Sequence, residues 1–310
     1  MRFAFIKCHG SGNDFPLIDG RAIVLDDGEW AAVARALADR RGPVGGDGLL
    51  VLTEGNDVAQ FGQRMFNSDG SEAATCLNGL RCVARAGFEA LGIAAATVQL
   101  MRSTAEVARV AELAPGVATV RTRVGPASLD PGEVGLRVAA PVVDSAIPGL
   151  PNERRFTAVA MPNPHLVTFV DKVDERELVS LGWWCEAGPD LLEDRANVSF
   201  VEVRGSDLYV RTFERGVGLT DACGSAMAAS THAAGLTGRV PFGREITVFN
   251  PGGMVRAAAG EDGMVTIAGN ATFEWDGEID VDLATATASG LTLARRREDE
   301  VAAWESAKPV

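Results

Sequence analysis

Positive charge, histidine and long apolar runs are all scarce in this chain, and each shortage excludes a class of function. The sequence carries 29 basic against 42 acidic residues, a formal net charge of −13, whereas nucleic acids and anionic membranes bind clustered positive charge. No segment approaches the ~18 consecutive apolar residues of a membrane span, and the N-terminus is too short in apolar residues for a signal peptide. We therefore expect a cytoplasmic protein, with a small solute or a protein as its partner.

Metal-binding and cofactor-binding patterns are also missing. A zinc site draws on closely spaced cysteines and histidines, but the five cysteines include no Cys-x2-Cys pair and the three histidines are scattered. The number of cysteines is odd and their spacing is not that of a disulfide framework, which indicates reduced thiols. No lysine or phosphate-loop motif suggests a cofactor, so we expect neither a metal nor a cofactor.

The composition that remains is that of an ordinary globular chain. With 310 residues, 46% of them hydrophobic and 23% charged, two domains are expected. The 35 glycines exceed the usual ~7% and are spread through turn-like contexts. Many short strands joined by tight turns are therefore expected.

Two cysteines occupy the same local context in the two halves of the chain. Cys76 follows Phe66, and Cys223 follows Phe213, at the same spacing, and each cysteine precedes a helix pattern rich in small residues. A cysteine at a helix start meets unsatisfied backbone N–H groups and the positive end of the helix dipole, which lower its pKa. We therefore expect two reactive thiols, the alternative being that each is a buried and inert cysteine.

The repeated context extends over more than a hundred residues. Asn13 precedes Cys76 by 63 positions, and Asn163 precedes Cys223 by 60 positions. Matching anchors in matching order indicate an internal duplication. Two like domains are expected to pack about a pseudo-twofold axis, with their cysteine helices meeting at the interface, a common location for ligand sites.

The domain boundaries follow from the same register. The first domain is predicted at 1–123, with a returning C-terminal strand at about 272–290, and the second at 124–271. The remaining segment, 291–310, is charged and terminal, and we expect a surface helix or a disordered tail there.

Local patterns predict individual elements. Apolar residues at Trp30, Val33 and Leu37 mark one face of an amphipathic helix at 29–40. A shorter helix is predicted at 175–181. Strands are predicted, among others, at 49–52, 60–66, 137–142, 166–170, 197–203 and 208–213.

Two helix-start cysteines that face each other across a cleft suit the inversion of a carbon centre. One thiolate can remove a proton from one face of an amino-acid α-carbon while the other thiol returns a proton to the opposite face. The α-carbon is a very weak acid, so the site must stabilise the charge that moves into the carboxylate. First-turn backbone N–H groups can do so, and the candidates are Leu77, Asn78, Gly224 and Ser225.

Six motifs in matching order, from about residue 3 to 275, resemble the diaminopimelate epimerase family. They are Gly12-Asn13-Asp14-Phe15, Asn67-Ser-Asp-Gly-Ser-Glu, Cys76-x-Asn-Gly-x-Arg-Cys82, Asn163-Pro-His165, Glu214-Arg215-Gly and Ala222-Cys223-Gly-Ser225. The resemblance implies a cofactor-independent isomerase of the lysine and cell-wall pathway, which converts LL- to meso-diaminopimelate. It also implies an α/β (α+β) fold of two pseudo-symmetric domains, each a β-barrel-like sheet around a central helix, with the active site between them.

The resemblance also implies roles for particular residues. Cys76 and Cys223 would be the acid and base. The substrate pocket would be lined by Asn13, Asn67, Asn163, Asn197, Glu214 and Arg215. Arg215 can fork onto the distal carboxylate of the substrate while Glu214 takes the distal ammonium. Asn13 and Asn67 could instead be turn residues, and Glu214 with Arg215 a solvated surface pair. His165 is expected to be structural.

Several positions depart from the family pattern and keep other readings open. Leu77 and Ala226 replace family glycines, Leu219 replaces a glutamate, and Val107 and Asn270 also differ. A racemase for another amino acid with the same two-cysteine mechanism is therefore an alternative. A non-catalytic amino-acid binder and a Cys76–Cys223 disulfide switch are others. A homodimer is one option for the oligomeric state.

Overall fold

The chain divides into two compact units. The computed structural model describes residues 1–74 and 76–308. Unit 1 comprises Met1–Thr122 and Ala268–Lys308, and unit 2 comprises Arg123–Ile267. The polypeptide therefore passes from unit 1 into unit 2 and back again, and each unit is described by itself.

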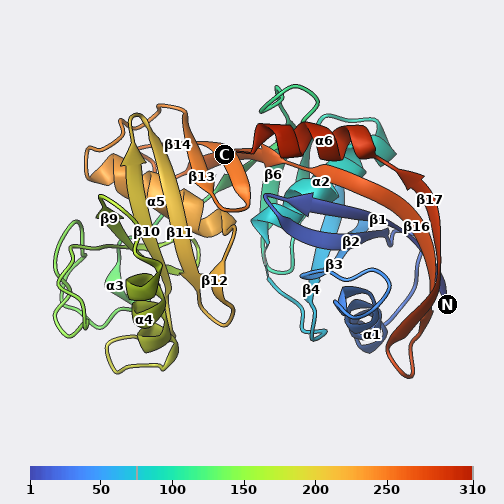
Figure 1. Ribbon diagram of the computed structural model, residues 1–310, viewed down its shortest axis with the longest axis horizontal. Helices are drawn as coiled ribbons and strands as arrows, with labels where there is room; N and C mark the ends of the chain where they lie inside the picture. Colours follow the sequence, from blue (N-terminus) through green and yellow to red (C-terminus); the bar gives the residue numbers. More distant parts are fainter. Residues whose placement is uncertain (75, 309–310) are drawn as a thin grey trace. The chain divides into compact units, whose positions relative to one another are not determined.

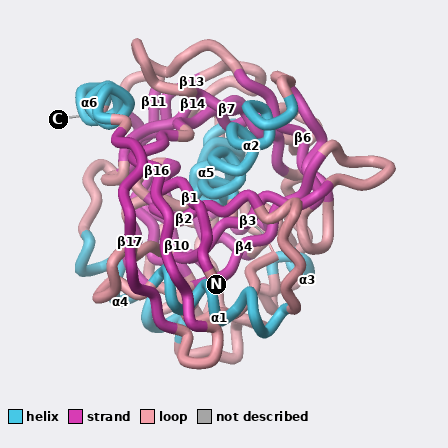
Figure 2. The backbone as a smooth tube through the Cα atoms, turned by 90° about the vertical axis from the view of Figure 1, so that its right-hand side faces the viewer, coloured by secondary structure: helices cyan, strands magenta, loops and turns pink. Residues whose placement is uncertain are grey.

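Unit 1 is a curved sheet wrapped around one helix, α2 (Leu77–Leu91). Strand β1 pairs antiparallel with both β2 and β16, β2 runs parallel to β3, and the sheet continues through β4, β5, β6 and β7. Helix α2 contacts β1 to β6 (Figures 1 and 2). The strands are β1 (Arg2–Gly10), β2 (Asn13–Asp19), β3 (Gly48–Glu54), β4 (Phe61–Asn67), β5 (Ala95–Gln99), β6 (Thr104–Arg109), β7 (Thr119–Val124), β16 (Thr272–Asp282) and β17 (Thr287–Arg296).

Close packing of α2 against the strands depends on glycine. A Cβ atom on Gly87 would lie 2.6 Å from the ring of Phe61, and one on Gly79 would lie 2.6 Å from Leu50. Both glycines lie on a helix that buries twelve of its fifteen residues. The small side chains therefore let the sheet close around the helix.

The amphipathic helix predicted at 29–40 is confirmed as α1 (Asp27–Ala38). It begins earlier than predicted because Asp26 and Glu29 form a capping box, in which each side chain accepts a hydrogen bond from the other residue's backbone N–H. Trp30, Val33 and Leu37 lie in a hydrophobic core between the helix and the sheet.

Unit 2 repeats the plan of a sheet around one helix, α5 (Gly224–Leu236). Strand β9 runs parallel to β10, β10 pairs antiparallel with β11, and β11 runs parallel to β13. Helix α5 contacts β8 to β11 and β14. The strands are β8 (Thr157–Ala160), β9 (Pro164–Val170), β10 (Asn197–Arg204), β11 (Asp207–Glu214), β12 (Gly218–Thr220), β13 (Ile246–Asn250), β14 (Gly253–Ala259) and β15 (Val265–Asn270). The predicted α/β class with two repeated sheet-and-helix modules is confirmed.

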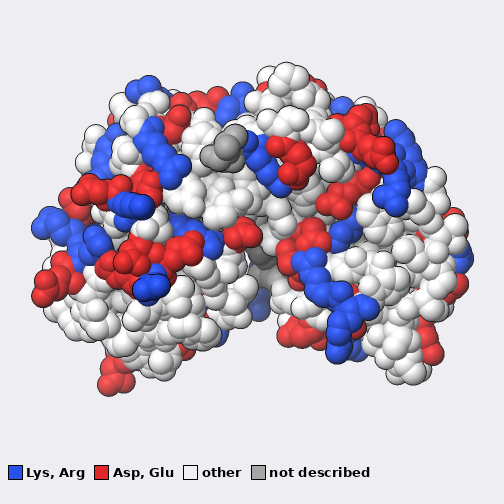
Figure 3. Space-filling view, in the orientation of Figure 1, with Lys and Arg blue, Asp and Glu red and all other residues white. Residues whose placement is uncertain are grey.

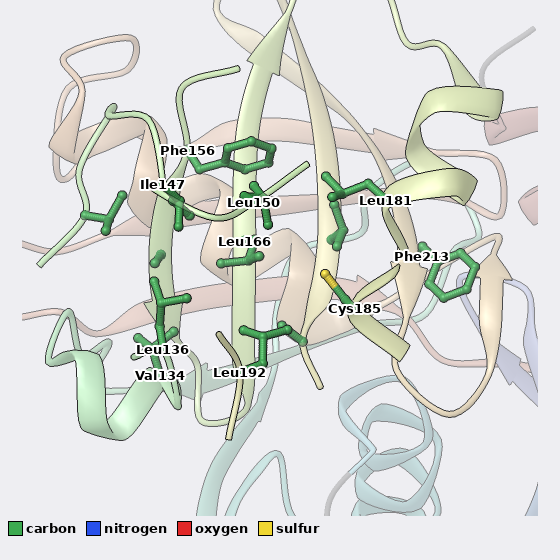
Figure 4. Close-up of a cluster of buried hydrophobic side chains, with 14 of the residues drawn as sticks. Val134, Leu136, Ile147, Leu150, Phe156, Leu166, Leu181, Cys185, Leu192 and Phe213 are labelled. Atoms are coloured by element: carbon green, nitrogen blue, oxygen red, sulfur yellow. The ribbon is translucent and has the colours of Figure 1, made fainter. Parts of the chain in front are cut away.

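A hydrophobic core of unit 2 packs between strands of its sheet and the helices α3 (Pro131–Val134) and α4 (Glu175–Glu186) (Figure 4). Leu178, Leu181 and Cys185 form the buried face of α4. Gly182 allows the ring of Phe213 to approach, because a Cβ atom there would lie 2.2 Å from it. The helix predicted at 175–181 therefore continues for another turn.

The strand predicted at 137–142 is wrong. Its hydrogen bonds go to separate segments, since the Arg137 N–H donates to Leu191 and the Val142 carbonyl accepts from Ala158. Pro141 also lacks the N–H that a ladder requires. The segment is consequently irregular.

Residues 291–308 of the charged segment predicted as a surface helix or a disordered tail have regular structure, and residues 309–310 lie outside the described part of the chain. Residues 291–296 complete β17, which pairs antiparallel with β16, and α6 (Glu298–Ala307) follows. Figure 1 shows α6 lying along β16, which it contacts. Trp304 anchors the helix and is 1% exposed.

Charged side chains of both signs are interspersed on the face drawn in Figure 3. Within the described part of the chain, no helix has the length and apolarity that crossing a membrane would require.

Candidate active site

Cys76 caps the N-terminus of α2, as its position in the sequence predicts. Its backbone is extended, with φ −137° and ψ 104°, and its half-buried Sγ accepts a hydrogen bond from the Gly79 N–H at 3.4 Å. Leu77 and Asn78 form the first helical residues and are 8% and 2% exposed. The thiol of Cys76 therefore lies among the first-turn amides of the helix that unit 1 encloses.

Asn13 and Asn78 form one hydrogen-bonded chain beside this helix start. The Asn78 Nδ2 donates to Asn13 Oδ1 at 2.9 Å, and the Asn13 Nδ2 donates to Asp47 Oδ2 at 2.6 Å. Asp47 also accepts from Arg40 and from the Asp14 N–H. The orientation of the Asn13 amide is thus fixed at both ends. The role of Asp47 is not evident from the sequence, although it stands in a glycine-rich break between helix and strand.

Asn67 has a local environment that differs from that of Asn13. It is exposed at the end of β4, its Nδ2 donates to Ser71 Oγ at 2.9 Å, and its N–H donates to the Ser71 carbonyl at 2.8 Å. These bonds are those of a turn residue. A substrate contact would use the side-chain oxygen or the second Nδ2 hydrogen of Asn67.

A buried arginine supports the loop that carries Asn13. Arg81 is fully buried and donates to Ser11 Oγ and to the Asn270 carbonyl, each at 2.9 Å. The Ser11 N–H in turn donates to Asn270 Oδ1 at 2.7 Å. Burial lowers the pKa of Arg81 to about 10, so the guanidinium remains charged at neutral pH. Arg81 belongs to the motif that begins at Cys76, but its partners Ser11 and Asn270 are distant in sequence, so its supporting role is not evident from the sequence.

Cys223 occupies the N-cap position of α5 with the extended backbone that Cys76 has at α2, but its side chain makes no capping hydrogen bond. Its φ is −128° and its ψ is 112°, and its Sγ lies 3.4 Å from Ser225 Oγ. It is only 8% exposed. Burial, together with the nearby Glu214 carboxylate, raises the pKa of this thiol well above its usual value. The lowered pKa predicted from the helix start is therefore wrong for Cys223, because burial and the Glu214 carboxylate outweigh the interactions with Ser225 and the Ala226 backbone that lower this pKa.

Glu214 ends β11, Arg215 follows it, and both have defined partners within unit 2. The Thr220 hydroxyl donates to Glu214 Oε1. The Arg215 Nη1 donates to Asp194 Oδ2 at 2.6 Å, and its backbone N–H donates to Asn197 Oδ1 at 3.0 Å. Arg215 is therefore tied to Asn197 through its backbone, while its guanidinium forms an ion pair.

Asn197 and Asn163 are both held by unit 2. The Asn197 Nδ2 donates to the Pro164 carbonyl at 3.0 Å, and Asn163 Oδ1 lies 3.0 Å from His165 Nε2. Since an amide oxygen only accepts, Nε2 carries the proton. His165 is fully buried, and burial together with the charge of Arg215 lowers its pKa to about 3. A neutral His165 thus orients Asn163.

The structure gathers the predicted residues into two groups. In unit 1, Asn13 and Asn78 are joined beside Cys76, and Asn67 lies in its own turn. In unit 2, Gly224 and Ser225 adjoin Cys223. The other predicted residues of this unit lie at or next to the ends of the paired strands β9, β10 and β11, and they are Asn163, Asn197, Glu214 and Arg215. Among residues 1–74 and 76–308, no group of three or more His, Cys, Asp and Glu side chains could hold a metal ion.

Removing the charge of Glu214 should lower the pKa of Cys223. In Glu214→Gln the carboxylate that raises this pKa is gone while the side-chain shape is kept. We expect the pH profile of Cys223 alkylation, followed by peptide mass spectrometry, to move to lower pH. The control is Glu186→Gln, which removes a carboxylate that is paired with Arg195 and the Gly216 N–H, and in which the profile should stay unchanged. An unchanged profile for Glu214→Gln would contradict the assigned electrostatics.

Acidification to pH 5 should already destabilise both units, at a pH higher than that at which ordinary carboxylates become protonated. The pKa values of His9 and His165 are lowered to about 4 and about 3, chiefly by burial. Their folded-state pKa values lie below the unfolded value of about 6.5. The free energy of unfolding is therefore undiminished above about pH 6.5 and decreases as the pH falls from there toward the folded-state pKa values. Each histidine should cost about 2 kcal/mol at pH 5. Urea midpoints at pH 7.5 and pH 5 measure the loss, and equal midpoints would contradict it.

Comparison with known proteins places the chain. A family model described as diaminopimelate epimerase matches residues 5–125 and 157–274. The diaminopimelate epimerase of Clostridium acetobutylicum is 38% identical over 285 residues, covering 89% of this chain and 85% of the relative. That of Lactiplantibacillus plantarum is 39% identical over 292 residues, covering 88% of each.

Solved structures share the fold at low sequence identity. A hydroxyproline epimerase from Agrobacterium vitis has a TM-score of 0.65 and 14% identity, covering 91% of this chain and 92% of its own. A phenazine biosynthesis protein of Bacillus anthracis has a TM-score of 0.63 and 13% identity, covering 91% and 100%. These similarities concern the fold alone, whereas the family match covers both units and both capping cysteines. The chain therefore belongs to the diaminopimelate epimerase family.

Proposed function

We propose that this protein converts LL-diaminopimelate to meso-diaminopimelate, with Cys76 and Cys223 acting on the same α-carbon from opposite faces. The observation that carries the proposal is that each unit starts its enclosed helix with a cysteine as N-cap. Family membership over nearly the whole chain supports the same reaction.

Each cysteine has a distinct starting state in this scheme. The raised pKa of Cys223 favours the thiol, which can donate a proton. Cys76, half-buried among first-turn amides, is then the thiolate base. Cys76 takes the α-proton, and the electrons of the broken C–H bond move into the carboxylate. The Cys223 thiol protonates the opposite face, and the roles exchange for the reverse reaction.

Backbone N–H groups stabilise the charge that develops on the carboxylate. Leu77 and Asn78 supply them from α2, and Gly224 and Ser225 from α5. Each well-placed donor is worth roughly 10²–10³ in rate. Because thiolate and thiol perform both proton transfers, the scheme needs no cofactor.

The distal amino-acid head of the substrate would be bound by side chains of both groups. Arg215 would pair with the distal carboxylate, sharing or exchanging its present partner Asp194, and Glu214 would accept from the distal ammonium. Amide groups would complete the pocket, and these are Asn13, Asn67, Asn163 and Asn197. We also propose a cytoplasmic location and include a homodimer among the assemblies to be tested.

Incubation with LL-diaminopimelate tests the activity. We expect the meso isomer to accumulate until both stereoisomers reach equilibrium, as followed by chiral chromatography. Failure of the fully reduced protein to form the meso isomer would overturn the proposal.

Leu77 supports a second candidate, a racemase for another amino acid. It stands where the family usually has glycine, directly after the proposed base, and its side chain is 8% exposed. A panel of amino acids in the same assay separates the two functions. Turnover of another amino acid in preference to LL-diaminopimelate would favour the second candidate.

A further inference from the structure

Helix α6 lies outside the part of the chain matched by the family model, which ends at residue 274. Trp304 is its only fully buried side chain among the described residues, at 1% exposure. The indole ring packs on the imidazole of His9, with ring centroids 5.8 Å apart and planes inclined by 54°. The C-terminal helix therefore contacts the end of β1, where the loop to Asn13 begins.

His9 contacts both Trp304 and the loop that leads to Asn13. The Gly12 N–H donates to His9 Nδ1 at 3.4 Å, and the Asn270 Nδ2 lies 3.3 Å from the same nitrogen. Two donors converge on Nδ1, so this nitrogen carries no proton and the ring is the neutral Nε2–H tautomer. Burial and the charge of Lys308 lower the pKa of His9 to about 4, which keeps the ring neutral at physiological pH.

The position of α6 is fixed by a partly buried ion pair as well as by Trp304. The Glu300 carboxylate accepts from Arg85 Nη2 at 2.9 Å and from the Phe273 N–H at 3.3 Å. Arg85 lies on α2, the helix that Cys76 caps. Helix α6 is therefore anchored to the same helix that presents the proposed base.

The loop between His9 and Asn13 is a tight turn between β1 and β2, in which Gly10 pairs with Asn13 and His9 pairs with Asp14. Ser11 adopts the left-handed region at φ 53°, held by Asn270 and Arg81, and Gly12 follows at φ 87°. A non-glycine residue in this region is strained and needs surrounding contacts to hold it. Asn270 and Arg81 supply these contacts to Ser11. His9 accepts from the adjacent Gly12 N–H, and the Trp304 ring packs against the His9 ring.

We propose that Trp304 is a positioning residue for Asn13, acting through the His9 ring and the Gly12 N–H to hold the loop that presents the Asn13 amide. The C-terminal helix is then part of the substrate-binding apparatus of this protein rather than a solvated tail. The kinetic part of this inference rests on the proposed function, whereas the structural part does not.

Hydrogen exchange tests the structural part without substrate. In Trp304→Ala we expect the amides of a peptide covering residues 9–15 to exchange at least about tenfold faster than in the wild type, since the ring contact that holds His9 is lost. Trp304→Phe keeps an aromatic face and should restore most of the protection. If the alanine variant fails to fold, Glu300→Gln, which weakens the anchor of α6, takes its place.

Trp30→Ala is the matched control. Trp30 is 4% exposed and packs against Phe3 in the core between α1 and the sheet, so it reports the general cost of losing a buried tryptophan. We expect it to lower the melting temperature without selectively accelerating exchange in residues 9–15. Equal acceleration in both variants, or none in Trp304→Ala, would overturn the inference.

Kinetics with LL-diaminopimelate supply the second readout. A displaced Asn13 should lower kcat/KM about 10–100-fold in Trp304→Ala, with recovery in Trp304→Phe and little change in Trp30→Ala. An inactive wild-type protein would refute the proposed function, and the exchange measurement would still decide the role of Trp304. An active wild type with unaltered kinetics in Trp304→Ala would refute the positioning role.

Discussion

Replacing Cys223 with alanine is expected to lower kcat for diaminopimelate epimerisation by about 10²–10⁴-fold, the range that a positioned general acid or base contributes. The Cys76→Ala variant should show a loss of the same order, because each direction of the reaction uses both groups. The affinity for substrate should change much less, since neither thiol is assigned to hold the distal head. Initial rates and equilibrium binding measured on the same preparations test both statements.

Two other cysteines provide matched controls. Cys82 lies on the same helix as Cys76, and Cys185 lies on α4 in the core of unit 2, and both are fully buried. Cys82→Ala and Cys185→Ala should lose stability through small cavities while keeping kcat within a few-fold. A Cys76→Ala or Cys223→Ala variant that retained wild-type kcat would contradict the two-cysteine scheme.

Substituting Gly10 with alanine is expected to lower kcat/KM by about 10²-fold, a loss that displacement of a binding group by about 1 Å can cause. A Cβ atom at this position would lie 2.5 Å from the Asn78 carbonyl oxygen and 3.0 Å from Arg81 Nη2. The contact would push the end of β1 away from the first turn of α2. The 2.9 Å hydrogen bond between Asn78 and Asn13 would then be lengthened or lost.

Stability should fall as well, by about 1–3 kcal/mol, as for other insertions into well-packed sites. Steady-state kinetics and urea unfolding measure the two effects. Gly28→Ala is the control, because its Cβ atom would meet only the Asp26 side chain, at 3.3 Å, on a helix where alanine is favoured. Wild-type kcat/KM in Gly10→Ala would show that the close approach of β1 to α2 does not position Asn13.

Local sequence was sufficient to predict the two capping cysteines and the repeated plan. The spacing from Phe66 to Cys76 is repeated from Phe213 to Cys223, and a strand followed by a helix start is encoded over a short segment. The ionisation of Cys223 could not be predicted in this way. Its pKa depends on the burial of the thiol in the folded chain and on the Glu214 carboxylate, and both raise the pKa that the helix start alone was predicted to lower.

The contacts that hold the Asn13 loop could not be predicted from local sequence either, because they join residues that are far apart in the chain. Asn270 lies 259 positions from Ser11, and Trp304 belongs to a charged segment whose composition alone suggested a surface helix or a tail. The irregular course of residues 137–142 likewise reflects hydrogen bonds to separate segments rather than a local pattern. Sequence patterns therefore identified the elements that carry the chemistry, while the contacts that position them required the fold.

Deuterium uptake during the first few per cent of reaction tests two-base chemistry most directly. With LL-diaminopimelate in D₂O, the newly formed meso product should carry solvent deuterium at the inverted carbon while the remaining substrate stays almost unlabelled. Two separate thiols predict this asymmetry, because the proton removed by Cys76 is not the one delivered by Cys223. Deuterium appearing equally fast in substrate and product, or product that retains the original proton, would contradict the assignment of Cys76 and Cys223 as a two-base pair.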